Sequence, residues 1–131
     1  MPPFFSSALI YRSIKQAVLL QHRGPPCSNA GKWGLFGGHS EIGETPIMTL
    51  LRELQEELGM LFSNEGIEEL FEFQKPSGLI GHIFLVRTDR EKDSFVLGEG
   101  QGFDWIPINN VLEYDLTPSA KYSLERFLWC E

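Results

Sequence analysis

The chain has 131 residues, of which 42% are hydrophobic and 22% charged, and its formal charge is −7 from 11 basic and 18 acidic side chains. This length favours a single domain over residues 1–131, large enough to build a hydrophobic core without disulfides or a structural metal. The negative charge argues against a long nucleic acid as partner, but a phosphorylated small molecule remains open because bound cations neutralise such a site.

The cysteines and the N-terminal segment give no sign of export. Cys27 lies in a Pro-rich stretch and Cys130 near the C-terminal end, without the Cys/His spacing of a zinc site. The segment "MPPFFSSALIYRS" lacks the basic and apolar regions of a signal peptide, and no stretch approaches a membrane-spanning length. We therefore expect two free thiols in a reducing compartment, a cytoplasmic location and no membrane contact.

The N-terminal third predicts three strands. Residues 6–12 and 15–23 form the first two, and the near-continuous apolar centre of the second is typical of burial on both faces. A loop is expected over 24–32, followed by a short strand over 33–36. The Gly-Gly-His segment at 37–39 is expected to end that strand.

A helix is predicted over Pro46–Leu58. Thr45 suits the N-cap, Pro46 the first helical position and Gly59 the position after the helix. The apolar side chains fall on one stripe of the helix, which should face the core. They are Ile47, Leu50, Leu51, Leu54 and Leu58.

The remaining chain predicts an antiparallel strand pair over 67–76 and 78–88, a further strand over 102–108, and a final helix that begins after Thr117. The order of strands, helix, strands and helix fits helices packed against a mixed sheet. The apolar face expected for the final helix consists of Tyr122, Leu124, Phe127 and Leu128.

Three carboxylates crowd one side of the first helix. In "RELQEELGM", Glu53, Glu56 and Glu57 lie about 130° around the helix from the apolar stripe. Like charges at this spacing weaken a helix by a few tenths of a kcal/mol per pair, so the arrangement indicates a bound cation. Arg52 stands four residues before Glu56, within reach of its carboxylate. A solvated acidic face is the simpler alternative.

The spacing continues beyond the helix and resembles the Nudix box at every constrained position. The matching positions are Gly38, Glu44, Arg52, Glu53, Leu54, Glu56, Glu57, Gly59 and Met60. The preceding "GKWGLFGGH" resembles the W-x-x-x-G-G lead-in of MutT-like members. The later "GEGQGFDWIPINNVLEYDLTP" resembles the family's late acidic residue, Trp strand and helix start, so the likeness spans most of the chain.

The resemblance implies an α/β fold, a Nudix-type α/β/α sandwich with a mixed β-sheet. It also implies metal-dependent hydrolysis of a diphosphate linkage in a nucleoside derivative. The residues agree with this chemistry, because Mg²⁺ prefers oxygen ligands and uses a few carboxylates together with substrate phosphates. Mg²⁺ or Mn²⁺ is therefore the expected cofactor. Such an ion polarises a phosphoryl oxygen and lowers the pKa of a bound water.

Site roles follow from matched positions. Glu56 and Glu57 are expected to be metal ligands, and Glu53 a third ligand or the base that orients water. Glu99 resembles the late acidic residue that binds a further metal or activates water, with a solvated loop acid as its alternative. The Gly37 carbonyl is an additional candidate ligand, because glycine lets the backbone approach closely.

Arg52 is expected to orient a glutamate rather than to touch substrate. Arg23 and Lys32 are candidates for binding substrate phosphate, with surface solvation as the alternative. Gly38 and Glu44 complete the candidate substrate-binding set. Their alternatives are a turn position for the glycine and support of the loop or the metal site for the glutamate.

The substrate is less constrained. The MutT-like lead-in favours nucleoside triphosphates, including oxidised ones, with release of the monophosphate and pyrophosphate. Pro76 lies 16 residues beyond Met60, close to the position at which ADP-ribose hydrolases of this family carry a proline. An ADP-ribose or nucleotide-sugar pyrophosphatase is therefore the alternative function. A hairpin turn is the alternative explanation of this proline. A nucleotide-sensing Nudix module is the non-enzymatic alternative. Monomer and homodimer both remain open.

Overall fold

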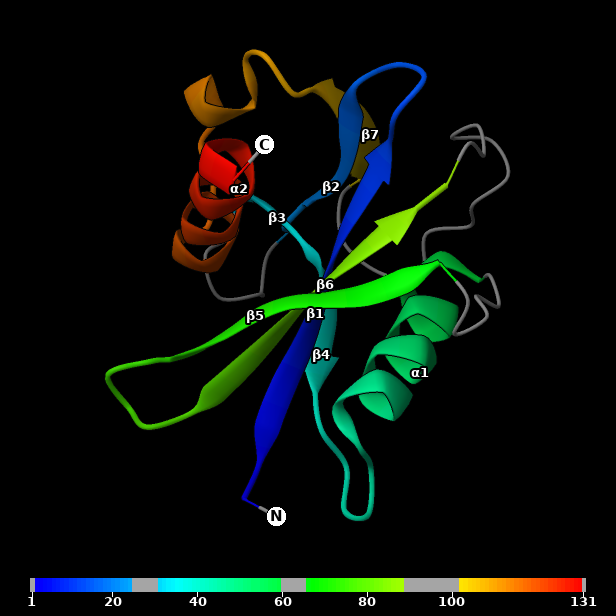
Figure 1. The fold of residues 1–131 in the computed structure, drawn as a ribbon, viewed down its shortest axis with the longest axis vertical. Coiled ribbons are helices and arrows are strands. Elements are labelled where there is room, and N and C mark those ends of the chain that lie inside the picture. Colours follow the sequence, from blue (N-terminus) through cyan, green and yellow to red (C-terminus); the bar gives the residue numbers. More distant parts are fainter. Residues whose placement is uncertain (1, 25–30, 60–65, 89–101, 131) are drawn as a thin grey trace.

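The computed structural model describes residues 2–24, 31–59, 66–88 and 102–130, which form a seven-stranded sheet with helices on both faces (Figure 1). The strands are β1 (Phe4–Arg12), β2 (Ala17–His22), β3 (Trp33–Gly34), β4 (Phe36–His39), β5 (Ile67–Gln74), β6 (Ile80–Arg87) and β7 (Gly102–Pro107). The helices are α1 (Pro46–Leu58), α2 (Pro118–Cys130) and a short 3₁₀ turn, η2 (Val111–Glu113).

The sheet is mixed. Its path is β3-β2-β1-β6-β5, with β4 paired to β1 and β7 paired to β2. The β1–β6 pair is parallel and the other pairs are antiparallel. In Figure 1, α1 and α2 lie on opposite sides of this sheet. The predicted α/β/α sandwich with a mixed sheet is therefore confirmed.

Strand alternation divides the core into two layers. On β1, Leu9 packs in the layer that contains α2, whereas Ala8 and Ile10 pack in the layer that contains α1. On β2, Leu20 and Leu19 divide in the same way, which confirms that this strand is buried on both faces. Because successive side chains of a strand point to opposite faces, one apolar run fills both layers.

The local signals for α1 are confirmed. The helix spans Pro46–Leu58, the Thr45 side chain accepts a hydrogen bond from the Met48 backbone N–H, and Gly59 adopts a left-handed conformation with φ 66°. Leu50, Leu54 and Leu58 are fully buried, as the apolar stripe predicts.

Two expectations from the sequence are wrong. Gly37 and Gly38 do not end the third strand, because both belong to β4, which pairs with β1 from Phe36 to His39. Gly37 has φ 150°, and a Cβ there would overlap the Ser6 backbone, so this close pairing requires glycine.

The second error concerns the final helix. The sequence predicts Tyr122 on its apolar face, but the residue is 41% exposed and its ring contacts Phe71 and Phe73 of β5. Ala120 and Leu124 turn toward the sheet. No helix in the described ranges has the length and apolar character needed to span a membrane.

Candidate active site

An acidic pocket of about 620 Å³ opens where α1 meets β4 and the loop that follows it. Helix α1 supplies its acidic wall, while β2 and the backbone of β4 supply the opposite side. The lining residues are Gln21, Arg23, Gly37, Gly38, His39, Ser40, Glu41, Arg52, Glu53, Glu56 and Glu57. Four of the predicted box residues on α1 are thus brought together around one cavity.

Arg52 is the centre of the charge network. Its Nε lies 2.7 Å from Glu44 Oε2, and its Nη1 lies 2.9 Å from Glu53 Oε1 and 3.4 Å from Glu56 Oε2. Its Nη2 donates to the His39 carbonyl at 2.9 Å. Its Nε also lies 3.4 Å from Glu41 Oε1. A guanidinium has five donors in a fixed plane, so one side chain holds four carboxylates and the loop backbone together. Arg52 therefore contacts the glutamates that it is expected to orient; because it also lines the pocket, the expectation that it does not touch substrate stays a prediction.

Glu44 belongs to this network rather than to the pocket wall. It accepts hydrogen bonds from the Arg52 side chain, the Thr49 hydroxyl and the Glu41 backbone N–H. These contacts, the one from Arg52 above all, lower the pKa of Glu44 to about 2, and its carboxylate raises the pKa of Arg52. Its geometry favours the loop-support alternative; a direct role in substrate binding stays a prediction.

Glu57 has different partners from Glu53 and Glu56, which Arg52 contacts. Only 4% of the residue is exposed, although the helical wheel placed it on the acidic face. Its Oε1 accepts a hydrogen bond from the Gly37 backbone N–H at 2.8 Å, and its Oε2 accepts one from the Gln21 side-chain amide at 3.2 Å. Each oxygen of this buried carboxylate therefore has a hydrogen-bond donor.

Gln21 was missed by the sequence reasoning. It is a polar residue within an apolar strand and is only 4% exposed, and its amide also donates to the Leu35 carbonyl at 3.1 Å. Buried polar groups need partners, so a glutamine in "AVLLQH" was a usable signal. The sequence could not say that one of its partners is Glu57.

The two glycines of β4 bring the backbone against the carboxylates. A Cβ added to Gly38 would overlap the carboxylate of Glu53. The observed position of the Glu53 side chain therefore requires glycine at residue 38. Gly37 contacts Glu57 through its N–H. Close backbone approach, which the sequence analysis expects at Gly37, thus occurs at both glycines; the Gly37 carbonyl as a metal ligand stays a prediction.

The donor set fits a hard divalent cation. Around the pocket stand the carboxylates of Glu53, Glu56 and Glu57 and the backbone of Gly37, which offer oxygen ligands of the kind that Mg²⁺ and Mn²⁺ prefer. The side chain of Glu56 is 57% exposed and that of Glu53 is 15% exposed. Solvent therefore reaches Glu56 more readily than Glu53.

A second pocket of about 650 Å³ adjoins the first and shares Arg23, Gly37, Gly38 and His39 with it. Its own walls are aromatic and polar, and they come from β1, the β5–β6 hairpin and the start of α2. They include Phe5, Ser7, Phe73, Gln74, Lys75, Pro76, Thr117, Ser119 and Tyr122. The ring of Phe73 contacts the rings of both Phe5 and Tyr122. Pro76 is the residue of this wall that the sequence analysis associates with substrate choice.

The remaining predicted site residues are distributed unevenly. Arg23 and Gly38 line both pockets, as expected for substrate-binding candidates. Lys32 lines neither and forms an exposed ion pair with Asp115 at 2.9 Å, so its role in phosphate binding stays a prediction. Glu99 and Met60 lie outside the described residues.

Comparison with known proteins matches residues 5–127 to the NUDIX domain. The CTP pyrophosphohydrolase of Escherichia coli K12 is 30% identical over 122 residues, covering 93% of this chain and 88% of the relative. The 8-oxo-dGTP diphosphatase of the same strain is 28% identical over 110 residues, covering 84% of each. A MutT structure, from work on Aliivibrio salmonicida and Vibrio cholerae, superposes with a TM-score of 0.81 at 21% identity and 98% coverage of both chains.

Proposed function

Because the chain belongs to the Nudix family and is a Nudix pyrophosphohydrolase, we propose that its substrate is a nucleoside triphosphate. The products are the nucleoside monophosphate and pyrophosphate, and the cofactor is Mg²⁺ or Mn²⁺. Relatives that align with most of the chain are named for CTP and for 8-oxo-dGTP, which supports a triphosphate as the substrate class.

One observation carries this proposal: the acidic pocket and the aromatic pocket share four lining residues. A substrate that fills both must combine a polyphosphate, which meets a cation among carboxylates, with a flat apolar group, which packs against Phe5, Phe73 and Tyr122. A nucleotide combines both parts, a polyphosphate at one end and a flat base at the other. Arg23 stands where the two pockets meet and offers a planar cation to a phosphate.

The contacts of each residue indicate its role in the site. Glu56, Glu57 and the Gly37 carbonyl would hold the cation, which when bound polarises a phosphoryl oxygen and lowers the pKa of a coordinated water. Gln21 and the Gly37 N–H fix the Glu57 carboxylate. Glu53 is the preferred base, because its carboxylate has one oxygen held by Arg52 and lines the pocket.

Arg52 holds the carboxylates in place. Its positive charge lies beside Glu44, Glu53 and Glu56 and reduces the repulsion among these carboxylates when no metal cation is bound. The site is thus organised before the cation arrives, which reduces the cost of rearrangement during the reaction.

A nucleotide sugar is the second candidate substrate. Pro76 and Lys75 line the aromatic pocket near the turn of the β5–β6 hairpin, so the position highlighted by the sequence does face a candidate substrate site. ADP-ribose carries a second sugar that could occupy this end of the pocket. This candidate predicts AMP as a product and no pyrophosphate.

A nucleotide panel tests the proposal. CTP, dCTP, dGTP, 8-oxo-dGTP and ADP-ribose are incubated with the protein in Mg²⁺ or in EDTA, and pyrophosphate and monophosphate are quantified. We expect Mg²⁺-dependent release of pyrophosphate from at least one triphosphate. Glu56→Gln should abolish turnover, whereas Glu113→Gln, an exposed glutamate that lines neither pocket, should retain it.

The same panel separates the alternatives. Turnover of ADP-ribose alone would replace the triphosphate with a nucleotide sugar. Tight nucleotide binding without turnover in Mg²⁺ would identify a nucleotide sensor and overturn the enzymatic proposal.

A further inference from the structure

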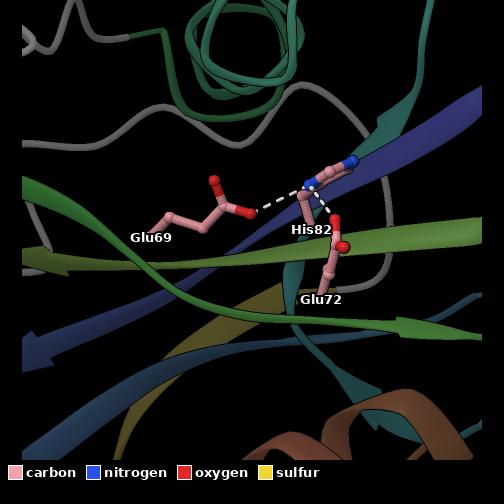
Figure 2. Close-up of side chains that lie close together, drawn as sticks. All are labelled: Glu69, Glu72 and His82. Carbon is pink, nitrogen blue, oxygen red and sulfur yellow. Dashed lines mark hydrogen bonds and ion pairs between the residues drawn. The ribbon is translucent and has the colours of Figure 1, made fainter.

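Three metal-ligating side chains converge on the β5–β6 pair, outside both pockets. Glu69 and Glu72 of β5 and His82 of β6 have their ligand atoms within 4.8 Å of one another. Figure 2 shows both carboxylates turned toward the imidazole ring. The Nδ1 atom of His82 lies 2.9 Å from Glu69 Oε2 and 3.5 Å from Glu72 Oε2. None of the three lines the acidic or the aromatic pocket.

A β-bulge brings the two glutamates to the same face of the sheet. In a regular strand, residues three apart point to opposite faces. Here the pairing with β6 shifts by one residue between Glu69 and Phe71, which makes Leu70 the extra residue. Glu72 then pairs directly with His82. Bulges of this kind re-aim side chains, and without this one the two carboxylates would be separated by the sheet.

The imidazole is held in place before any ligand binds. The His82 side chain is only 13% exposed, and the Phe4 ring packs edge-on against it with ring centres 5.3 Å apart and planes at 84°. The Nδ1 atom therefore stays directed at the carboxylates. A ligand whose rotamer is fixed by packing loses little conformational entropy when it binds a metal.

Glu69 and Glu72 share His82 as a partner. Within the described ranges, neither Glu69 nor Glu72 pairs with Lys or Arg, and both contact His82. The neighbouring Glu68 differs, because it pairs with Arg87 at 3.0 Å. Two carboxylates around one imidazole therefore form a locally negative site whenever the imidazole is neutral.

We propose that Glu69, Glu72 and His82 bind a divalent transition metal, with Zn²⁺ as the representative ion. One imidazole nitrogen and two carboxylates give three protein ligands of the type that zinc accepts, and a water completes a tetrahedron. Ligand atoms of a tetrahedral zinc lie about 3.4 Å apart, close to the 2.9 Å and 3.5 Å contacts of Nδ1.

The nitrogen ligand gives this site a different metal preference from the proposed oxygen-only cation site beside α1, because imidazole suits zinc better than magnesium. A bound metal would also join β5 to β6 just before the turn whose residues line the aromatic pocket.

The test measures zinc directly and needs no hydrolytic activity, so its outcome is independent of the proposed function. The full chain is titrated with ZnCl₂ against a chromophoric zinc chelator, in excess Mg²⁺ to occupy the oxygen-only site. Wild type is compared with Glu72→Gln and with the matched control Glu68→Gln on the same strand. Both side chains are more than half exposed, so the substitutions should leave the fold intact, as circular dichroism verifies.

We expect Glu72→Gln to weaken zinc binding by about tenfold or more, as loss of a ligand should, and Glu68→Gln to leave it unchanged. In nuclear magnetic resonance spectra, Zn²⁺ should shift the ring signals that His82→Gln removes. Equal zinc affinity in all three proteins, or shifts confined to the rings of His22 or His39, would overturn the proposal.

Discussion

The side-chain amide of Gln21 donates a hydrogen bond to Glu57 Oε2 at 3.2 Å, inside the molecule and across 36 positions of sequence. The second oxygen of Glu57 accepts from the Gly37 N–H at 2.8 Å. One carboxylate of the candidate metal site is thus fixed by two elements of the sheet, while Glu53 and Glu56 are held from within α1 by Arg52. This division of support determines how each substitution should act.

Replacement of Gln21 by leucine should impair the site. A hydrogen bond to a charged group contributes about 1.5–3 kcal/mol, so we expect kcat/KM to fall roughly ten- to hundredfold. Mn²⁺ binding, followed by paramagnetic relaxation, should weaken in parallel, which a purely structural role would not require. Gln55→Leu, on the exposed side of α1, is the control. Unchanged Mn²⁺ affinity in Gln21→Leu would contradict a positioning role.

Gly38→Ala should reduce activity more than stability. The new Cβ would overlap the Glu53 carboxylate, which is the mobile end of a side chain and can move aside at little cost. We expect kcat to fall at least tenfold, because misplacement of a reacting group by about 1 Å has effects of that order. Gly102→Ala is the matched control, since nothing lies within 4 Å of its Cβ. Equal kcat values for the two variants would show that the Glu53 position is unimportant.

Arg52→Lys should not behave as a conservative change. Lysine keeps the charge, but it cannot span Glu44, Glu53, Glu56 and the His39 carbonyl, which the guanidinium contacts together. We expect lower thermal stability and a loss of kcat of roughly tenfold or more. Melting curves and initial rates measure the two effects. A lysine variant with wild-type values of both would contradict the role assigned to this network.

The Glu44 contacts predict a defined acid sensitivity. Its pKa falls from 4.5 in the reference state to about 2 in the folded protein. The unfolded chain therefore binds this proton first, so the stabilisation is complete above pH 4.5 and is lost as the pH falls toward 2. Urea unfolding should show Glu44→Gln less stable than wild type at pH 7, with the gap narrowing by pH 3. A gap that is constant with pH would refute this linkage.

Tyr122→Leu should affect substrate binding rather than chemistry. Tyr122 lines the aromatic pocket and is 41% exposed, so its loss should not disrupt the core. Stacking of an aromatic side chain on a base contributes about 1–3 kcal/mol, so KM should rise roughly tenfold with kcat little changed. Trp129→Leu, at an 80% exposed position of the same helix, is the control. A fall in kcat at constant KM would place Tyr122 outside the base-binding surface.

The sequence by itself determined the elements whose signals are local. Thr45, Pro46 and Gly59 set the ends of α1, because caps act on backbone groups within one turn. The box spacing placed Glu53 and Glu56 on one pocket wall, because helical periodicity fixes which residues share a face.

The tertiary structure alone decided which distant groups meet. Gln21 reaches Glu57 because the fold brings the end of β2 close to the last turn of α1. The aromatic pocket forms because β1, the β5–β6 hairpin and the start of α2 meet there. A single bulge at Leu70 sets the faces of the glutamates on β5. Such contacts depend on strand register and packing across the sheet, which no local pattern encodes.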